Sequence, residues 1–156
     1  MSGATRVKVI GIGSPFGADR IGWRLVEALR TGDFPHVVFE QLDRPGAALL
    51  DHLDGVAHGV LIDAMQGGGA VGEVRALCLD EVIAQNRLLS SHGFGVGQCL
   101  ALGQALGRLP PRLTIFGVEV GGAPDRLGAA ELARIERQGV ALIGAHLTEI
   151  ESELSQ

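Results

Sequence analysis

The segment "VKVIGIGSPFGADRIGWRLVEAL", residues 7–29, decides the fold of this chain. It begins with the apolar run Val7–Ile12, which leads into glycine and is typical of a buried parallel strand. From Ile21 onward the apolar residues follow helical spacing, with Leu25 and Leu29 on the same face. The segment therefore predicts a strand joined to a helix by a short glycine-containing turn.

The rest of the chain alternates in the same way. We predict further strands within residues 36–43, 59–65, 73–79 and 109–120, of which 73–79 lies at the edge of the sheet. Helical segments are predicted within residues 44–55, 80–98, 96–107 and 124–154. This alternation predicts an α/β three-layer sandwich, in which a mostly parallel, twisted sheet carries helices on both faces. We expect residues 1–156 to form a single α/β domain, because no linker, repeat or low-complexity segment divides them.

The composition argues against several classes of function. Apolar residues make up 46% of the chain, which predicts a folded protein. The net charge is −5 and there is no basic tract, so nucleic acid is not an expected partner. No apolar run reaches the roughly 20 residues of a membrane-spanning helix, and no signal-peptide pattern is present. We therefore expect a cytoplasmic protein without membrane insertion.

The cysteines and most of the histidines are predicted to be structural. Cys78 and Cys99 lack CxxC spacing and each stands in an apolar run, so we predict two buried free thiols. Four histidines fall in predicted turns or on helix surfaces, where we expect solvated or packing residues: His36, His52, His58 and His146.

Polar residues gather where a ligand of such a sheet would bind. Ligands of open α/β sheets bind beyond the carboxyl ends of the strands, and the polar residues predicted there are Asp19, Asp43, Asp63, His92 and Glu119. Asp19, Asp63 and His92 each follow or precede an element that we expect to point at the same edge. Two carboxylates and one imidazole suit an open zinc or nickel site with room for water or substrate.

Each of these three residues also has an ordinary structural interpretation. Asp19 stands where a helix N-cap is expected, Asp63 stands at a strand end where a turn or cap is common, and His92 lies in a Ser-Ser-His-Gly loop. Only their convergence on one edge of the sheet favours the metal site over these interpretations.

A nucleotide site is the main alternative for the glycine turn. Its glycines are spaced G-x-G-x-x-x-G, which departs from the G-x-G-x-x-G of dinucleotide-binding proteins. Pro15 removes a backbone N–H that would bind a pyrophosphate, and Asp19 places negative charge near it. Glu40 is the acid that could bind a ribose. A nucleotide-binding α/β oxidoreductase is thus disfavoured but stays open.

Three blocks of the sequence resemble the nickel–iron hydrogenase maturation proteases, the endopeptidases that trim the C-terminus of the hydrogenase large subunit. The blocks are "VIGIGSPFGADRIGWRLVEAL", "VLIDAMQGGGAVGEV" and "SSHGFGVGQCLALGQALGRLPPRLTIFGVEV". Their combination and order are specific, whereas any one block alone would be weak. The resemblance implies an endopeptidase that removes the C-terminal extension of a hydrogenase large-subunit precursor after nickel insertion.

The resemblance also implies a metal site. The family uses an acid after the first glycine loop, an aspartate at the end of a central strand and a histidine in a later loop, which correspond here to Asp19, Asp63 and His92. Counting from the glycines would instead put Arg20 at the first ligand position, and an arginine cannot bind metal. We prefer Asp19, because helix phase is fixed by packing whereas loops absorb deletions. Arg20 keeps open the alternative of a non-catalytic relative that binds the precursor.

The resemblance implies that nickel, supplied by the substrate protein, is the cofactor. It implies no organic cofactor. Three ligands, two of them carboxylates, would bind nickel only modestly without the substrate.

Asp43 keeps an acid where the family often has a D-G-G turn, but Arg44 and Pro45 change that turn. Asp43, together with Gly11 and Gly13, is therefore a candidate for substrate recognition.

Overall fold

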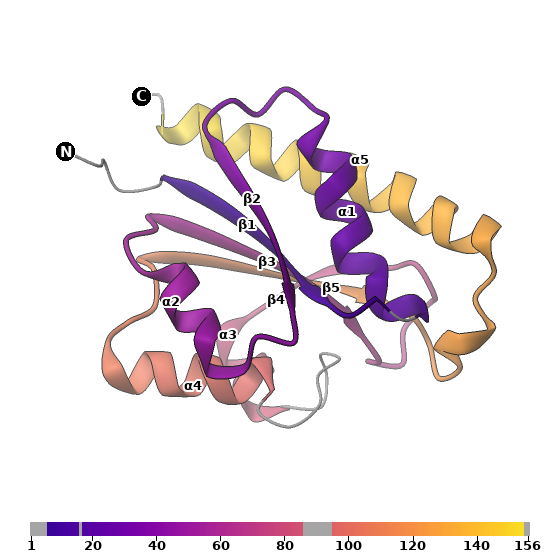
Figure 1. The fold of residues 1–156 in the computed structure, drawn as a ribbon, viewed down its shortest axis with the longest axis horizontal. Helices are drawn as coiled ribbons and strands as arrows, with labels where there is room; N and C mark the ends of the chain where they lie inside the picture. Colours follow the sequence, from indigo (N-terminus) through magenta and orange to yellow (C-terminus); the bar gives the residue numbers. More distant parts are fainter. Residues whose placement is uncertain (1–5, 16, 86–94, 155–156) are drawn as a thin grey trace.

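The central feature of the structure is a five-stranded sheet with the order β2-β1-β3-β5-β4 (Figure 1). The structure is a computed structural model that describes residues 6–15, 17–85 and 95–154. The strands are β1 (Val7–Gly13), β2 (Val37–Asp43), β3 (His58–Met65), β4 (Val74–Leu77) and β5 (Arg112–Glu119). Four strands run parallel, and β4 pairs antiparallel with β5 at the edge. The predicted parallel sheet and its edge strand are confirmed.

Helices cover both faces of this sheet (Figure 1). One face carries α1 (Ile21–Arg30) and α5 (Ala129–Leu154). The other face carries α2 (Leu49–Leu53), α3 (Leu79–Ala84) and α4 (Val96–Leu106). Three short 3-10 turns join these elements: η1 (Gly17–Arg20), η2 (Gly46–Ala48) and η3 (Pro124–Arg126). The predicted three-layer α/β sandwich is confirmed, while the extent of the domain stays a prediction.

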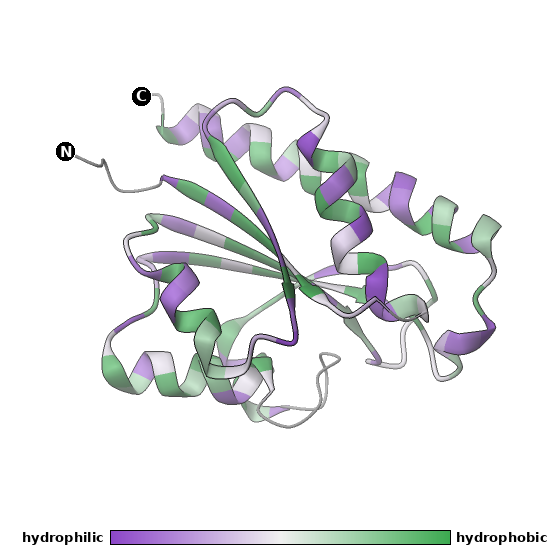
Figure 2. Cartoon of the chain, in the orientation of Figure 1, coloured by the Kyte–Doolittle hydropathy of each residue, from purple (hydrophilic) through white to green (hydrophobic). Residues whose placement is uncertain are grey.

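Two apolar cores lie on opposite faces of the sheet because side chains alternate along each strand. Val9 and Ile62 pack on the side of α1 and α5, whereas Ile10 and Leu61 pack on the side of α2 and α4. All eight residues of β3 are buried, as expected of a strand covered on both faces. In Figure 2 the hydrophobic segments concentrate along the strands and in stripes on the helices.

The long C-terminal helix α5 spans 26 residues, or about 39 Å at 1.5 Å per residue. Its buried residues follow the apolar spacing predicted from the sequence, and they include Ile135, Ile143, Leu147 and Ile150. Leu132, which belongs to the same predicted set, is partly buried against this core. Within the described ranges, no helix combines the length and the apolar character that crossing a membrane requires.

The start of α1 differs from the expectation for Asp19. The N-cap residue is Arg20, which has helical dihedral angles and makes no side-chain capping bond. Asp19 lies one residue earlier, inside η1. The 3-10 turn runs directly into α1, so the backbone is already helical before Ile21 and the N-cap role predicted for Asp19 is wrong.

Two structural predictions for thiols and histidines also need correction. Cys99 on α4 is a buried free thiol as predicted, but Cys78 is exposed. Cys78 directly follows the edge strand β4, and its Sγ accepts a hydrogen bond from the Glu81 N–H at 3.4 Å at the start of α3. His58 is a packing residue, but it is the first residue of β3 rather than part of a turn, and it bonds to Thr114 Oγ1 at 2.9 Å.

Candidate active site

The strand order changes direction between β1 and β3, and this reversal sets the place of the site. The chain leaves β1 for β2 on one side, then returns past β1 to β3 and continues toward β5 on the other side. Ligands of open α/β sheets bind at such a switch point, beyond the carboxyl ends of the two strands. The turn η1 lies there, in contact with both β3 and η3 (Figure 1).

Glycines let the beginning of α1 approach these strand ends closely. A Cβ atom on Gly22 would lie 2.8 Å from the carbonyl oxygen of Ile62 in β3, and one on Gly11 would lie 2.5 Å from the carbonyl oxygen of Gly22. A Cβ atom on Gly13 would overlap the carbonyl oxygen of Asp19. Gly11 and Gly13 thus have a packing role that brings Asp19 to the sheet edge, while their role in substrate recognition stays a prediction.

The carboxylate of Asp19 is oriented by the loop before it. Ser14 is 2% exposed, and its hydroxyl donates a hydrogen bond to Asp19 Oδ2 at 3.1 Å. The Ser14 N–H also bonds to the Asp19 carbonyl oxygen at 3.4 Å. The loop therefore closes on itself and directs a partly buried acid toward the end of β3.

Asp63 is the most deeply buried acid at this switch point. The residue is 1% exposed, and Oδ1 accepts a hydrogen bond from the Ala64 N–H at 2.8 Å. Oδ2 is also buried and has no hydrogen-bond partner among the described residues. Burial raises the pKa of the Asp63 carboxyl well above its usual value; the Ala64 N–H opposes this shift and the negative charge of Asp19 adds to it. A cation would relieve both the burial and the repulsion, so these two acids fit a metal ion.

The electrostatics also favour Asp19 over Arg20 as the acid of this site. Asp19 acts on the pKa of Asp63, whereas Arg20 is exposed at the N-cap of α1 and does not contribute to that shift. His92, the third predicted ligand, lies outside the described residues. Among the residues that the structure does describe, no three His, Cys, Asp or Glu side chains form a group that could hold a metal ion. The ligand set therefore stays a prediction.

Asp43 reaches the same edge of the sheet, on the far side of β1. It pairs in register with Gly13, and the Arg44 N–H donates to the Gly13 carbonyl oxygen at 3.1 Å. Asp43 is exposed and its Oδ1 accepts a hydrogen bond from Arg44 Nε at 2.8 Å. The φ angle of Arg44 is +42°, a left-handed conformation that glycine adopts more readily than arginine. The turn keeps this conformation although Arg44 stands where the family often has glycine. The recognition role of Asp43 stays a prediction.

Glu119, at the end of β5, has a set of contacts that sequence reasoning missed. The residue is 0% exposed. Its Oε1 accepts hydrogen bonds from the N–H groups of Gly67 at 2.9 Å and Gly69 at 3.1 Å, and its Oε2 accepts one from Gly121 at 3.0 Å. The sequence places an acid at this edge, but its partners are backbone groups that carry no residue-type signal.

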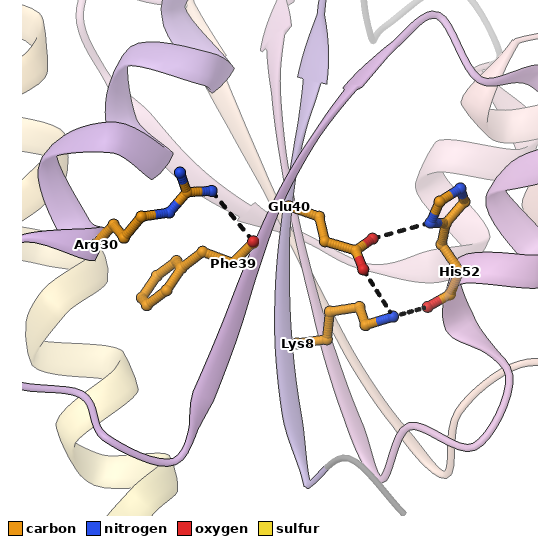
Figure 3. A network of polar contacts seen from close by, with 5 residues as sticks. All are labelled: Lys8, Arg30, Phe39, Glu40 and His52. Carbon is orange, nitrogen blue, oxygen red and sulfur yellow. Dashed lines mark hydrogen bonds and ion pairs between the residues drawn. The ribbon is translucent and has the colours of Figure 1, made fainter.

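Glu40, the acid of the nucleotide interpretation, is engaged elsewhere (Figure 3). It lies opposite Ile10 in the middle of β2, away from the carboxyl end. Its carboxylate lies 3.2 Å from Lys8 Nζ and 2.9 Å from His52 Nδ1, and Lys8 Nζ also donates to the His52 carbonyl oxygen at 2.8 Å. The structure therefore gives no support to a ribose-binding role for Glu40.

Comparisons with known proteins agree on one family. A sequence model of the hydrogenase maturation protease family matches residues 24–147. No curated protein matches the chain at the sequence level. The structure is similar to that of the hydrogenase maturating endopeptidase HybD from E. coli, with 25% identity and a TM-score of 0.72 over 92% of this chain and 93% of that chain.

Two further solved structures share the fold. An endopeptidase from Escherichia coli, determined in solution, has 23% identity and a TM-score of 0.74 over 92% of this chain and 93% of that chain. A [NiFe] hydrogenase maturation protease, HycI from Thermococcus kodakarensis KOD1, has 21% identity and a TM-score of 0.64 over 94% of this chain and 95% of that chain. At these identities the likeness establishes the fold alone.

Proposed function

Because the chain belongs to the hydrogenase maturation protease family, we propose that it acts on a nickel–iron hydrogenase large-subunit precursor through a centre formed by Asp19, Asp63 and His92. The chain is an endopeptidase of hydrogenase maturation, consistent with C-terminal processing of the large subunit. The observation that carries the proposed centre is Oδ2 of Asp63, which is buried at the switch point of the sheet, unpartnered among the described residues and repelled by Asp19.

The residues of the centre have different tasks. Ser14 holds the carboxylate of Asp19 at the sheet edge, and the Ala64 N–H holds one oxygen of Asp63, which leaves its other oxygen to bind a cation. His92 is included on the sequence resemblance alone. Asp19, Asp63 and His92 would hold the ion, whose chemistry there would be to polarise the scissile carbonyl or to lower the pKa of a bound water. We propose nickel, carried by the substrate protein, as that ion.

Arg20 is assigned a place beside the centre rather than in it. It is exposed at the start of α1, and its guanidinium has no lone pair to offer a metal ion. The cytoplasmic location and the identity of the partner as a hydrogenase large-subunit precursor belong to the same proposal.

The test is processing of a nickel-loaded large-subunit precursor that carries its C-terminal extension. The wild-type protein should shorten the precursor by the mass of the extension, as measured by intact-protein mass spectrometry. Asp19→Ala, Asp63→Asn and His92→Ala should each leave the precursor uncut, whereas Arg20→Ala should cut it.

Two results would contradict the proposal. Normal processing by Asp19→Ala would show that the first ligand is a different residue. Equal processing of nickel-loaded and nickel-free precursor would show that no nickel-dependent step takes place. Asp33→Asn, at an exposed residue of the turn between α1 and β2, is the matched control.

A further inference from the structure

We propose that Glu119 is a positioning residue for substrate binding. It holds residues 67–72 and the turn at Gly121 as one wall of the site, and the extended C-terminal segment of the precursor docks along that wall. This inference rests on the proposed function and adds to it the surface that receives the peptide.

The three hydrogen bonds of Glu119 explain why an acid stands at this position. All three partners are N–H donors, which a carboxylate accepts on both of its oxygens, whereas a glutamine would offer only one oxygen. Burying a carboxylate is costly unless its oxygens are hydrogen-bonded. Three consecutive glycines, residues 67–69, would lose much conformational freedom on becoming ordered. Glu119 offsets that loss by fixing the backbone at two of them.

The two loops that Glu119 joins form one unit at the carboxyl edge of the sheet. Met65 and Glu119 are partners in the β3–β5 register. The side chain of Gln66 donates to the Gly121 carbonyl oxygen at 3.0 Å, and the Gly72 N–H donates to the Glu119 carbonyl oxygen at 2.8 Å. The unit therefore begins two residues after Asp63, on the strand that carries the proposed metal ligand.

The exposed side of this unit suits an extended peptide. Residues 66–71 are all exposed, although the N–H groups of Gly67 and Gly69 are hydrogen-bonded to the buried Glu119 carboxylate. A Cβ atom added to Gly68 or Gly122 would meet nothing within 4 Å, so another backbone can approach closely there. Because Glu119 already orders this backbone, a peptide that docks on it loses less binding free energy to loop ordering. Val71, 36% exposed, offers an apolar contact next to them.

The test measures precursor binding separately from precursor cutting. Affinities of wild type, Glu119→Ala and Glu119→Gln for the immobilised full-length precursor are measured by biolayer interferometry, well below the melting temperature of each variant. We expect about tenfold weaker binding for Glu119→Ala. Glu119→Gln should lose less, because its amide oxygen can still accept from Gly67 and Gly69. Glu131→Gln, an exposed acid at the start of α5, controls for the lost charge.

Two further readouts separate this role from a general effect on the fold. Hydrogen exchange should speed up at the amides of Gly67, Gly69 and Gly121 in Glu119→Ala. The rate of cutting at saturating precursor (kcat) should stay near the wild-type value, while KM rises about tenfold.

Faster exchange with unchanged precursor affinity would overturn the inference, and so would a loss of kcat at unchanged KM. Failure of the proposed function would look different, since wild-type protein would then bind the precursor without cutting it.

Discussion

Strand β3 buries a titratable side chain at each end, and the two surroundings differ. At the amino end, His58 Nε2 bonds to Thr114 Oγ1 at 2.9 Å while its Nδ1 has no partner among the described residues. At the carboxyl end, Asp63 bonds to the Ala64 N–H and its Oδ2 likewise has none. Each end of β3 thus has one buried side-chain atom without a hydrogen-bond partner among the described residues, and in this respect the two ends are alike.

At both ends, burial and neighbouring charges disfavour the charged form of the side chain. Burial lowers the pKa of His58, and the neighbouring charges of His146 and Arg112 lower it further against the opposing effect of Glu153, so this end favours a neutral imidazole. At the other end a second acid adds to the effect of burial on Asp63. Like-charged neighbours therefore act at both ends, and what distinguishes Asp63 is its place at the switch point of the sheet, where ligands of such folds bind.

Asp63→Asn is the strongest test of this contrast. We expect processing of the precursor to fall by about 100-fold or more, because a neutral amide is a poor metal ligand. The melting temperature should change by only a few degrees, since a neutral amide of the same shape costs less to bury than a carboxylate. Processing rate and thermal unfolding are measured on the same samples. A large loss of stability would make Asp63 a structural residue like His58.

Gly13→Ala should give the next largest effect. The added Cβ atom would overlap the carbonyl oxygen of Asp19, so η1 must move away from β1 and carry Asp19 with it. We expect kcat/KM for processing to fall by about 10- to 100-fold, because small displacements of a catalytic group have large effects. Gly128→Ala is the matched control, since nothing lies within 4 Å of its added Cβ atom. Equal activity of both variants would show that the position of Asp19 is not critical.

His58→Gln tests the other end of β3 through the pH dependence of stability. The folded chain holds the pKa of His58 below its ordinary value of 6.5, so below about pH 6.5 the unfolded chain binds a proton that the folded chain does not. Wild-type stability should therefore decrease as the pH falls below that value, and His58→Gln should decrease less. Thermal unfolding at pH 5.5 and 7.5 measures this difference. His36→Gln, at an exposed histidine, should behave as wild type.

The smallest expected effect is a difference in reactivity between the two thiols, and it tests how tightly α4 covers its face of the sheet. Cys78 is exposed, whereas Cys99 is buried and its burial raises the pKa of the thiol to about 11. In the native protein iodoacetamide should therefore label Cys78 within minutes and Cys99 only after unfolding. Mass spectrometry of the peptides distinguishes the two sites, with Cys78→Ser as the control. Rapid labelling of Cys99 would mean that this face opens in solution.

Much of the fold could be predicted because periodicity is a local property of the sequence. The apolar run at β1, the helical spacing of α1 and the edge position of β4 all follow from neighbouring residues. The 3-10 turn η1 could not be predicted, because Asp19 at that position is equally compatible with an N-cap. The exposure of Cys78 was missed since it depends on where the edge strand ends in space.

The candidate site was predictable only in part. Asp63 stands at the end of an unbroken apolar strand, a position that is readable from sequence. The choice between Asp19 and Arg20 depends on which residue faces Asp63, and that requires the packing of α1 against β1 and β3. The role of Glu119 depends on backbone N–H groups about 50 residues earlier in the chain, which leave no trace in the residue pattern.

The pairing of β1 with β3 has a consequence for the order of events during folding. Asp63 belongs to β3 and Asp19 follows β1 in η1, so the two become neighbours only when a long loop, which includes all of β2 and α2, has closed. Such long-range pairings are slow to form compared with local helices. A partly folded chain in which only the local helices have formed would therefore still lack the Asp19–Asp63 pair.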